Sequence, residues 1–239
     1  MPCIAIASMF RNAESYISHY TTQMADLTGH LCGLGYDIHL IAAEGDSTDQ
    51  TWTVLNERLN YLFGRIRHVS AQSKLTILQV NHGGPVFGSI DNEQRWRNIS
   101  MVCDKILEAV DPEDTFLVYV ESDLLWDVDT MQYLLGRLED SGIDAIAPIC
   151  IHKPTGLCYG TWDLRKNGQR FQAHKPYHPE VGLDLTPIDS AGACIVMRGE
   201  VARSCRFSPP ELGIVGFGHD INAHGYRLML DPTLFVFHP

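Results

Sequence analysis

The stretch "FLVYVESDLLW", residues 116–126, joins a strand-like run to two carboxylates. Five apolar or aromatic residues lead directly into Glu121 and Asp123, and the chain is apolar again from Leu124 to Trp126. An unpaired charge is expensive to bury, so the two carboxylates must leave the core. We therefore expect a buried strand that ends at a cleft, with the acidic side chains facing that cleft.

The segments on either side of this stretch repeat a strand–helix pattern. Short runs rich in Ile, Val and Leu alternate with longer segments of helical period, which is typical of an α/β protein with a largely parallel sheet. The predicted strands are 3–9, 37–43, 76–80, 115–120, 144–150, 191–197 and 233–237, and the predicted helices are 14–34, 51–63, 92–110 and 129–138. The pattern stops for about 40 residues after Cys150, and loops of that length are typically lids or binding loops.

The composition is that of a folded globular protein. Of its 239 residues, 45% are hydrophobic and 20% are charged, and this length predicts one domain over residues 1–239. No apolar run approaches the roughly 20 residues that cross a bilayer, and the first apolar segment is too short for a signal peptide. The seven cysteines are odd in number and contain no C-x-x-C, so neither a disulfide framework nor a zinc knuckle is predicted, and a reducing cytoplasm is the simplest setting.

The charge distribution bears on possible partners. A formal net charge of −11 disfavours a broad nucleic-acid-binding face, because such a face needs clustered Lys and Arg. One region, 150–176, runs against this trend with five basic residues against Asp163. It either contacts an anionic ligand or is a solvated loop.

A second group of acids follows the second predicted strand. The stretch "AAEGDSTDQT" (42–51) contains Glu44, Asp46 and Asp49 just before a helix. Ligands bind beyond the carboxyl ends of parallel strands, so these acids should lie near the pair that ends the opening stretch. Carboxylates in such a place suit a hard cation such as Mg²⁺ or Mn²⁺. The alternative is that they cap the turns and the helix that follow them.

Taken in order, five segments resemble the glycosyltransferases of the GT-A fold, which use nucleotide-sugar donors. They are "SMFRNAESYI" (8–17), "EGDSTDQT" (44–51), "RWRNISMVCDKIL" (95–107), "ESD" (121–123) and "GFGHDINAHGYRLMLDPTLFVFH" (216–238). The second is similar to the family's Asp-x-x-Ser-x-Asp-x-Thr stretch, and "ESD" takes the place of its Asp-x-Asp metal motif. The resemblance implies an α/β GT-A (Rossmann-like) three-layer sandwich around a mostly parallel sheet.

The resemblance further implies how the single GT-A domain is divided. Residues 1–120 would form the nucleotide-binding half and residues 121–239 the metal site and acceptor half, with a loop insertion at about 150–190. Asp123 is the expected principal metal ligand, and His238 is expected to be a second ligand or to contact the diphosphate. The expected ion is Mn²⁺ or Mg²⁺, and an imidazole suits Mn²⁺ better. The residues expected to bind the nucleoside-diphosphate sugar are Glu44, Asp46, Asp49, Arg97 and Glu121.

Asp220 is the expected catalytic base of a hexosyl- or pentosyltransferase. A departing nucleoside diphosphate gains negative charge, which a bound dication stabilises in the transition state. The acceptor hydroxyl must lose its proton, and a carboxylate within hydrogen-bond reach can take it. If Asp220 lies beneath the sugar, the anomeric carbon is inverted; if it does not, a retaining reaction is open. A saccharide is the default acceptor, and a hydroxylated DNA base is the alternative.

Other interpretations remain open. The chain could be a sugar-nucleotide-binding module without transfer activity, or a nucleotidyltransferase, although "SMFRNAES" lacks the glycine-rich phosphate loop of that class. His219, His224 and His238 with Asp220 suggest a zinc site, but the first two would be separated by about 140° around a helix. Trp162 and Asp163 either line an acceptor site or fix the loop to the core.

Overall fold

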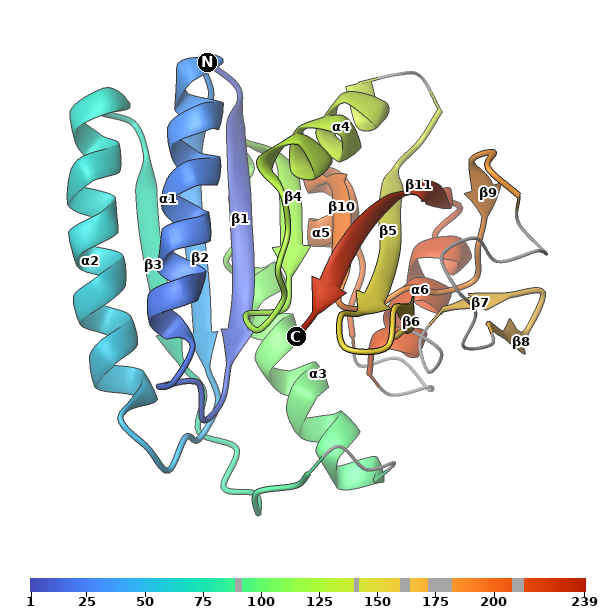
Figure 1. Cartoon of the computed structure of the whole chain (residues 1–239), viewed down its shortest axis with the longest axis horizontal. Coiled ribbons are helices and arrows are strands. Elements are labelled where there is room, and N and C mark those ends of the chain that lie inside the picture. The colour runs from blue at the N-terminus through green and yellow to red at the C-terminus, as the bar shows by residue number, and fades with distance from the viewer. Residues whose placement is uncertain (89–91, 140–141, 160–163, 172–181, 208–212) are drawn as a thin grey trace.

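The computed structural model describes the chain apart from residues 89–91, 140–141, 160–163, 172–181 and 208–212. Its centre is a nine-stranded sheet in the order β3-β2-β1-β4-β10-β5-β11-β9, with β6 paired to β5 (Figure 1). The strands are β1 (Cys3–Phe10), β2 (Asp37–Glu44), β3 (Lys74–Gln79), β4 (Asp114–Val120), β5 (Ala145–His152), β6 (Leu157–Cys158), β9 (Thr186–Pro187), β10 (Cys194–Arg198) and β11 (Leu228–His238). A separate hairpin pairs β7 (Arg165–Lys166) with β8 (Gln169–Arg170).

The long strands are parallel except for one. β1 is parallel to β2 and β4, β2 to β3, and β5 to β11. β10 lies between β4 and β5 and is antiparallel to both. The carboxyl ends of β1, β2, β3, β4, β5 and β11 therefore meet at one edge of the sheet, where ligands bind in open α/β folds.

Helices cover both faces of this sheet. Core residues of α1 (Ile17–Gly33), α2 (Thr51–Val69) and α4 (Val128–Glu139) form one apolar cluster on one face (Figure 1). Those of α3 (Glu93–Glu108), α5 (Gly199–Ser204) and α6 (Ile214–Ala223) form a second cluster on the other face. The predicted fold class, a GT-A (Rossmann-like) three-layer sandwich around a mostly parallel sheet, is confirmed.

Strand alternation explains how one sheet serves two cores. In β1, Ile4 and Ile6 belong to the cluster beneath α1 and α2, whereas Ala5 and Ala7 belong to the cluster beneath α3. Successive side chains of a strand point to opposite faces, so a fully apolar strand is what a sheet covered on both sides requires.

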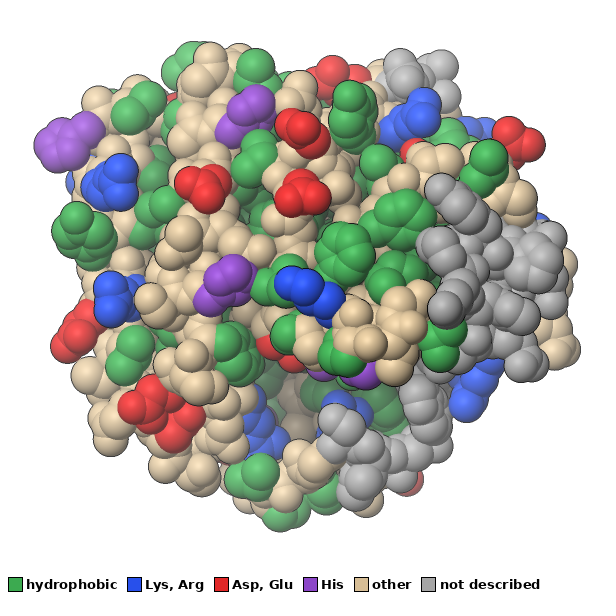
Figure 2. All heavy atoms as spheres, in the orientation of Figure 1, with side chains coloured by type: hydrophobic (Ala, Val, Ile, Leu, Met, Phe, Trp, Pro, Cys, Tyr) green, Lys and Arg blue, Asp and Glu red, His purple; other side chains and the backbone are tan. Residues whose placement is uncertain are grey.

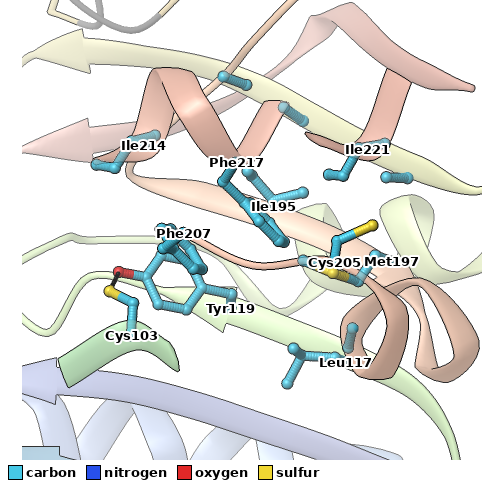
Figure 3. Packing of buried hydrophobic residues seen from close by; sticks show 14 of the residues in the cluster. Cys103, Leu117, Tyr119, Ile195, Met197, Cys205, Phe207, Ile214, Phe217 and Ile221 are labelled. Atoms are coloured by element: carbon cyan, nitrogen blue, oxygen red, sulfur yellow. Dashed lines mark hydrogen bonds between the residues drawn. The ribbon is translucent and has the colours of Figure 1, made fainter. Parts of the chain in front are cut away.

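An aromatic stack connects α6 to the central strand. The rings of Phe207 and Phe217 are parallel with centroids 4.1 Å apart, and Phe207 also packs on Tyr119 of β4 at 5.6 Å (Figure 3). The buried Tyr119 hydroxyl lies 3.3 Å from Cys103 Sγ of α3. Three elements of this face are therefore held through one set of buried rings, near the carboxyl end of β4.

The structure corrects several predicted boundaries. The last strand begins at Leu228 rather than at residue 233, and the 150–190 region contains β6, β7, β8 and β9 instead of loop alone. The strand predicted from residue 191 begins at Cys194. All seven cysteines are free, as the spacing predicted. Within the described ranges, no helix is both long and apolar enough to span a bilayer.

Candidate active site

Most of the predicted site residues, but not Asp220 or Arg97, lie at the carboxyl edge of the sheet. In the orientation of Figure 1 the surface is hollowed just below the C-terminal end of β11, and Lys or Arg and His side chains line this hollow (Figure 2). This edge carries the loops that follow β1, β2 and β4 and the last residues of β5 and β11. The side chains that these elements carry define the candidate site.

The two predicted metal ligands lie together. His238 Nε2 is 3.4 Å from Asp123 Oδ2, and both side chains are partly exposed, at 22% and 36%. Leu125 and Phe237 join the two segments, since each backbone amide donates to the other's carbonyl oxygen at 2.8 Å. The approach of residue 123 to residue 238 is thus fixed by a backbone bridge one residue from the histidine.

Two further aromatic residues surround His238. The Tyr159 ring stacks on the His238 imidazole with centroids 3.9 Å apart and an angle of 18° between the planes. His152, the last residue of β5, lies 6.3 Å from His238 and 5.9 Å from Tyr159, measured between ring centroids. The His152 Nδ1 atom lies 2.9 Å from the Thr155 hydroxyl. The metal-ligand candidate therefore belongs to a cluster of three rings.

Tyr16 shows that the acids of two loops converge. Burial raises the pKa of the Tyr16 phenol, and its hydrogen bond with Ser122 lowers it. The negative charges of Asp123, Glu121 and Asp49 each raise it further. One hydroxyl after β1 thus lies within electrostatic range of carboxylates after both β2 and β4, as the shared strand edge predicted.

Glu121 is partly buried and follows directly after β4. Its backbone amide donates to Ala193 O at 2.7 Å, which fixes the first residue after β4 to the start of β10. Burial raises the pKa of Tyr119 well above its ordinary range, and the Glu121 and Asp123 charges contribute to that rise. The Glu121 charge therefore acts on the buried phenol of Tyr119 and on the partly exposed phenol of Tyr16.

Asp49 shapes the loop in which it stands. Its Oδ1 accepts hydrogen bonds from the Thr51 amide and hydroxyl, at 3.0 and 2.5 Å, and its Oδ2 accepts from the Glu14 amide at 3.3 Å. Burial alone would raise the pKa of Asp49, but these hydrogen bonds outweigh it and lower the pKa. Asn12 adds a second connection, because its Oδ1 accepts from the Thr48 amide at 2.8 Å. The loops after β1 and β2 are thereby fixed to each other.

Asp46 turns toward the third strand end. Its backbone is left-handed, with φ of 53°, and its Oδ2 accepts from the amides of His82 and Gly83 at 2.8 and 2.6 Å. Burial lowers the pKa of His82 in spite of the nearby Asp46 charge. Glu44, which is buried, accepts from the Ser47 amide at 2.6 Å. In these contacts Asp46 and Glu44 shape the loops of the predicted donor site.

Asp220 lies in a different cluster. Its Oδ2 accepts from the Arg206 amide at 2.8 Å, and its Oδ1 is 3.7 Å from His224 Nδ1. Ligand atoms of Cys205, Asp220 and His224 all lie within 4.8 Å of one another. Burial, and secondarily the Asp220 charge, raise the pKa of the Cys205 thiol to about 12. Within the described residues, these contacts do not bring Asp220 to the pair Asp123 and His238.

The residues of the suggested zinc site also fall into two groups. His224 lies beside Asp220, whereas His238 lies beside Asp123, so the structure separates the histidines that this interpretation joins. A second group of possible metal ligands consists of His39, Asp111 and Asp114. The Lys74 ammonium already lies 2.6 Å from Asp111 Oδ2 in that group.

The remaining candidates lie on the surface or outside the described ranges. Arg97 pairs with Glu93 one helical turn earlier, at 2.5 Å, and both side chains are more than half exposed. Trp162 and Asp163 fall outside the described residues.

Sequence reasoning missed the contribution of Tyr16, His152 and Tyr159. Tyr16 fits the apolar spacing of the first helix, so its pattern indicated packing rather than a site. His152 and Tyr159 stand where the periodic pattern stops, and only the pairing of β5 with β6 places them beside His238. The one usable signal was that His152 follows the predicted strand 144–150 by two residues, because the carboxyl ends of parallel strands face the site.

Comparisons with known proteins add little to this geometry. No family model and no curated protein sequence matches the chain. Among solved structures, one similar chain is the 4-diphosphocytidyl-2C-methyl-D-erythritol synthase from Anaerococcus prevotii, with 8% sequence identity and a TM-score of 0.45. The alignment covers 95% of this chain and 85% of that one. A likeness of this degree assigns no activity to the chain.

Proposed function

We propose that the chain is a metal-dependent glycosyltransferase that moves a sugar from a nucleoside-diphosphate donor to an acceptor hydroxyl. The observation that carries the proposal is the 3.4 Å approach of Asp123 Oδ2 to His238 Nε2 at the carboxyl edge of the sheet. A sequence with the GT-A motif order predicted these two residues as partners, although 115 positions separate them in the chain. The convergence of Glu121, Asp123 and Asp49 on Tyr16 supports the same site.

The pair fits a divalent cation. Two ligands at roughly 2.1 Å from one ion and at right angles to each other lie about 3 Å apart, close to the observed 3.4 Å. Both side chains are open enough to exchange a hydrated ion, and a carboxylate with an imidazole favours Mn²⁺ over Mg²⁺. When bound, the ion would neutralise the charge that develops on the departing diphosphate.

The loops after β1 and β2 would form the donor side of the site. Asp46 and Asp49 use some of their acceptor positions to fix loop amides, and each carboxylate oxygen has two such positions. The remaining positions can accept hydrogen bonds from a base or from ribose hydroxyls, and Glu121 can accept from the ribose. Rigid loops reduce the ordering that donor binding would otherwise require.

The acceptor hydroxyl needs a base. Asp220 stays the predicted base, and its carboxylate faces Arg206, Cys205 and His224 in this structure. Asp220→Asn removes the acceptor of a proton and keeps the shape of the side chain. If Asp220 is the base, this variant binds donor normally and loses transfer. Nuclear magnetic resonance of the product first formed by the wild type distinguishes inversion from retention.

The experiment that tests the proposal measures Mn²⁺ and donor binding separately. Titration calorimetry with MnCl₂, and then with UDP- and GDP-sugars in its presence, is run on wild type, Asp123→Ala and His238→Ala. We expect both variants to lose metal-dependent donor binding. Asp129→Ala, which removes an exposed carboxylate six residues further along, is the matched control and should bind like wild type. Undiminished binding by Asp123→Ala would remove the metal site and the proposal with it.

Turnover assays separate the rival functions. A donor-panel hydrolysis and acceptor screen should release nucleoside diphosphate in an Mn²⁺-dependent manner. Release of pyrophosphate from a nucleoside triphosphate and a sugar phosphate would instead establish a nucleotidyltransferase. Donor binding with no turnover in either assay would establish a binding module.

A further inference from the structure

The β5–β6 hairpin places an aromatic ring against the candidate metal site. β5 ends at His152, the chain turns through Gly156 with a positive φ of 67°, and β6 pairs back on β5. The Tyr159 amide then donates to Cys150 O at 2.7 Å, which fixes the backbone of Tyr159 to the strand. The hairpin thus determines where the Tyr159 ring lies.

The backbone of His238 is fixed, but its ring is not fixed by the backbone. The His238 carbonyl accepts from the Lys153 amide at 2.8 Å, and the preceding Phe237 pairs with Leu125. An imidazole on a fixed backbone can still turn about its two side-chain torsions. The one hydrogen bond of the ring within the described residues is from Nδ1 to Pro239 O, at 3.2 Å.

The stack with Tyr159 fixes the plane of the His238 ring. Ring centroids 3.9 Å apart with planes at 18° are in van der Waals contact, since carbon atoms approach to about 3.5–4.0 Å. Tipping the imidazole out of its plane would drive its edge into the phenol ring. Two orientations related by a half turn about the second torsion keep this plane, and the observed one directs Nε2 at Asp123 Oδ2 and Nδ1 at Pro239 O.

We infer that Tyr159 is a positioning residue, which holds the His238 imidazole so that its Nε2 faces the cation shared with Asp123. This inference rests on the proposed metal site. The groups that orient a metal ligand commonly change metal affinity by about 10- to 100-fold when they are removed. The ring, and not the hydroxyl, provides this effect, so phenylalanine replaces tyrosine without loss.

The test measures Mn²⁺ affinity directly, by titration calorimetry and by the electron paramagnetic resonance of free Mn²⁺, without any sugar nucleotide. Tyr159→Ala and Tyr159→Leu should bind Mn²⁺ about 10-fold or more weakly than wild type, and Tyr159→Phe should bind like wild type. Leucine fills the volume without a flat ring, so it separates lost stacking from a collapsed hairpin. Tyr133→Ala, at a 65% exposed tyrosine of α4, is the control.

The outcomes distinguish this inference from the proposed function. Wild type that binds Mn²⁺ through Asp123 while Tyr159→Ala and Tyr159→Leu bind equally well overturns the positioning role and leaves the metal site intact. Weakened binding by Tyr159→Phe, equal to that of alanine, also overturns it, because the hydroxyl would then be responsible. Wild type that binds no Mn²⁺ overturns both proposals.

Discussion

Replacing Gly218 by alanine tests how closely α6 is seated on the segment that leads into β10. A Cβ at this position would lie 2.5 Å from Ser190 Cα and 2.6 Å from Asp189 O. Both are backbone atoms, and carbon atoms in contact need about 3.5 Å or more, so the overlap is about 1 Å. The helix must then move away from residues 189–190, which also weakens the hydrogen bond from Asn222 Nδ2 to Asp189 O.

The expected cost can be set against a gain. Overpacking of this kind costs about 1–3 kcal/mol, and alanine in a helix interior returns about 1 kcal/mol relative to glycine. Because the overlap is about 1 Å and involves backbone atoms, the cost lies in the upper part of this range, about 2–3 kcal/mol, and the net loss in the free energy of unfolding is about 1–2 kcal/mol. Gly136→Ala in α4 is the matched control, because no atom lies within 4 Å of its Cβ position. It should gain about 0.5–1 kcal/mol.

Urea unfolding, followed by far-ultraviolet circular dichroism and extrapolated linearly to water, measures both variants. The reasoning fails if Gly218→Ala is as stable as wild type, since the helix would then have room that the structure denies it. It also fails if Gly136→Ala loses as much unfolding free energy as Gly218→Ala, because the overlap at residue 218 would then have no effect of its own.

Three further outcomes are expected. Asp114→Asn should lower the free energy of unfolding at pH 7 by about 1–3 kcal/mol, since the buried carboxylate accepts from His39 Nδ1 at 2.8 Å. Burial acts to raise the pKa of Asp114, but the hydrogen bond from His39 and other hydrogen bonds lower it from 3.8. The difference in the free energy of unfolding between wild type and variant is therefore full above pH 3.8, and it disappears as the pH falls through the depressed pKa. Urea unfolding from pH 7 to pH 3 measures this difference. Alkylation of the native protein, followed by mass spectrometry, should modify Cys32 first, because the other six thiols are buried. Arg97→Ala should change the midpoint of thermal unfolding by less than about 2 °C, because an exposed ion pair with Glu93 contributes about 0.5 kcal/mol or less; a larger shift would show that this pair stabilises the fold.

The last strand shows where local sequence signals mislead. Asp231 and Pro232 have the composition of a turn, so the prediction began the strand at residue 233. In the structure the strand runs through both residues, and its register with β5 shifts between Asp231 and Phe235 to accommodate them. Asp231 Oδ1 accepts from the Thr233 amide at 3.0 Å, and its Oδ2 faces Arg137 Nε at 3.3 Å. A contact with α4 therefore stabilises the strand at residues whose local sequence indicates a turn.

The candidate site likewise contains residues that local sequence predicts and residues that it does not. The exposure of Asp123 and Glu121 at the strand end could be predicted, because an unpaired charge directly after a buried strand is costly to bury. The pairing of Asp123 with His238 required motif order, since nothing local connects them. Tyr159 could not be predicted, because a two-residue pairing of β6 with β5 determines its position. Periodicity therefore predicted the layers, and long-range pairing determined the ring cluster.

The position of β10 between β4 and β5 has a consequence for how the chain acquires its structure during synthesis. β1 to β4 leave the ribosome first and can pair with one another, yet the free edge of β4 has no neighbour until residues 194–198 have been made. β5 also lacks both of its long partners at that stage, and its second edge stays open until β11, residues 228–238, has been made. Unpaired apolar edges bind other chains readily. The nascent protein is therefore most vulnerable to misassembly while residues 121–193 are being translated, and chaperone contacts should concentrate in that interval.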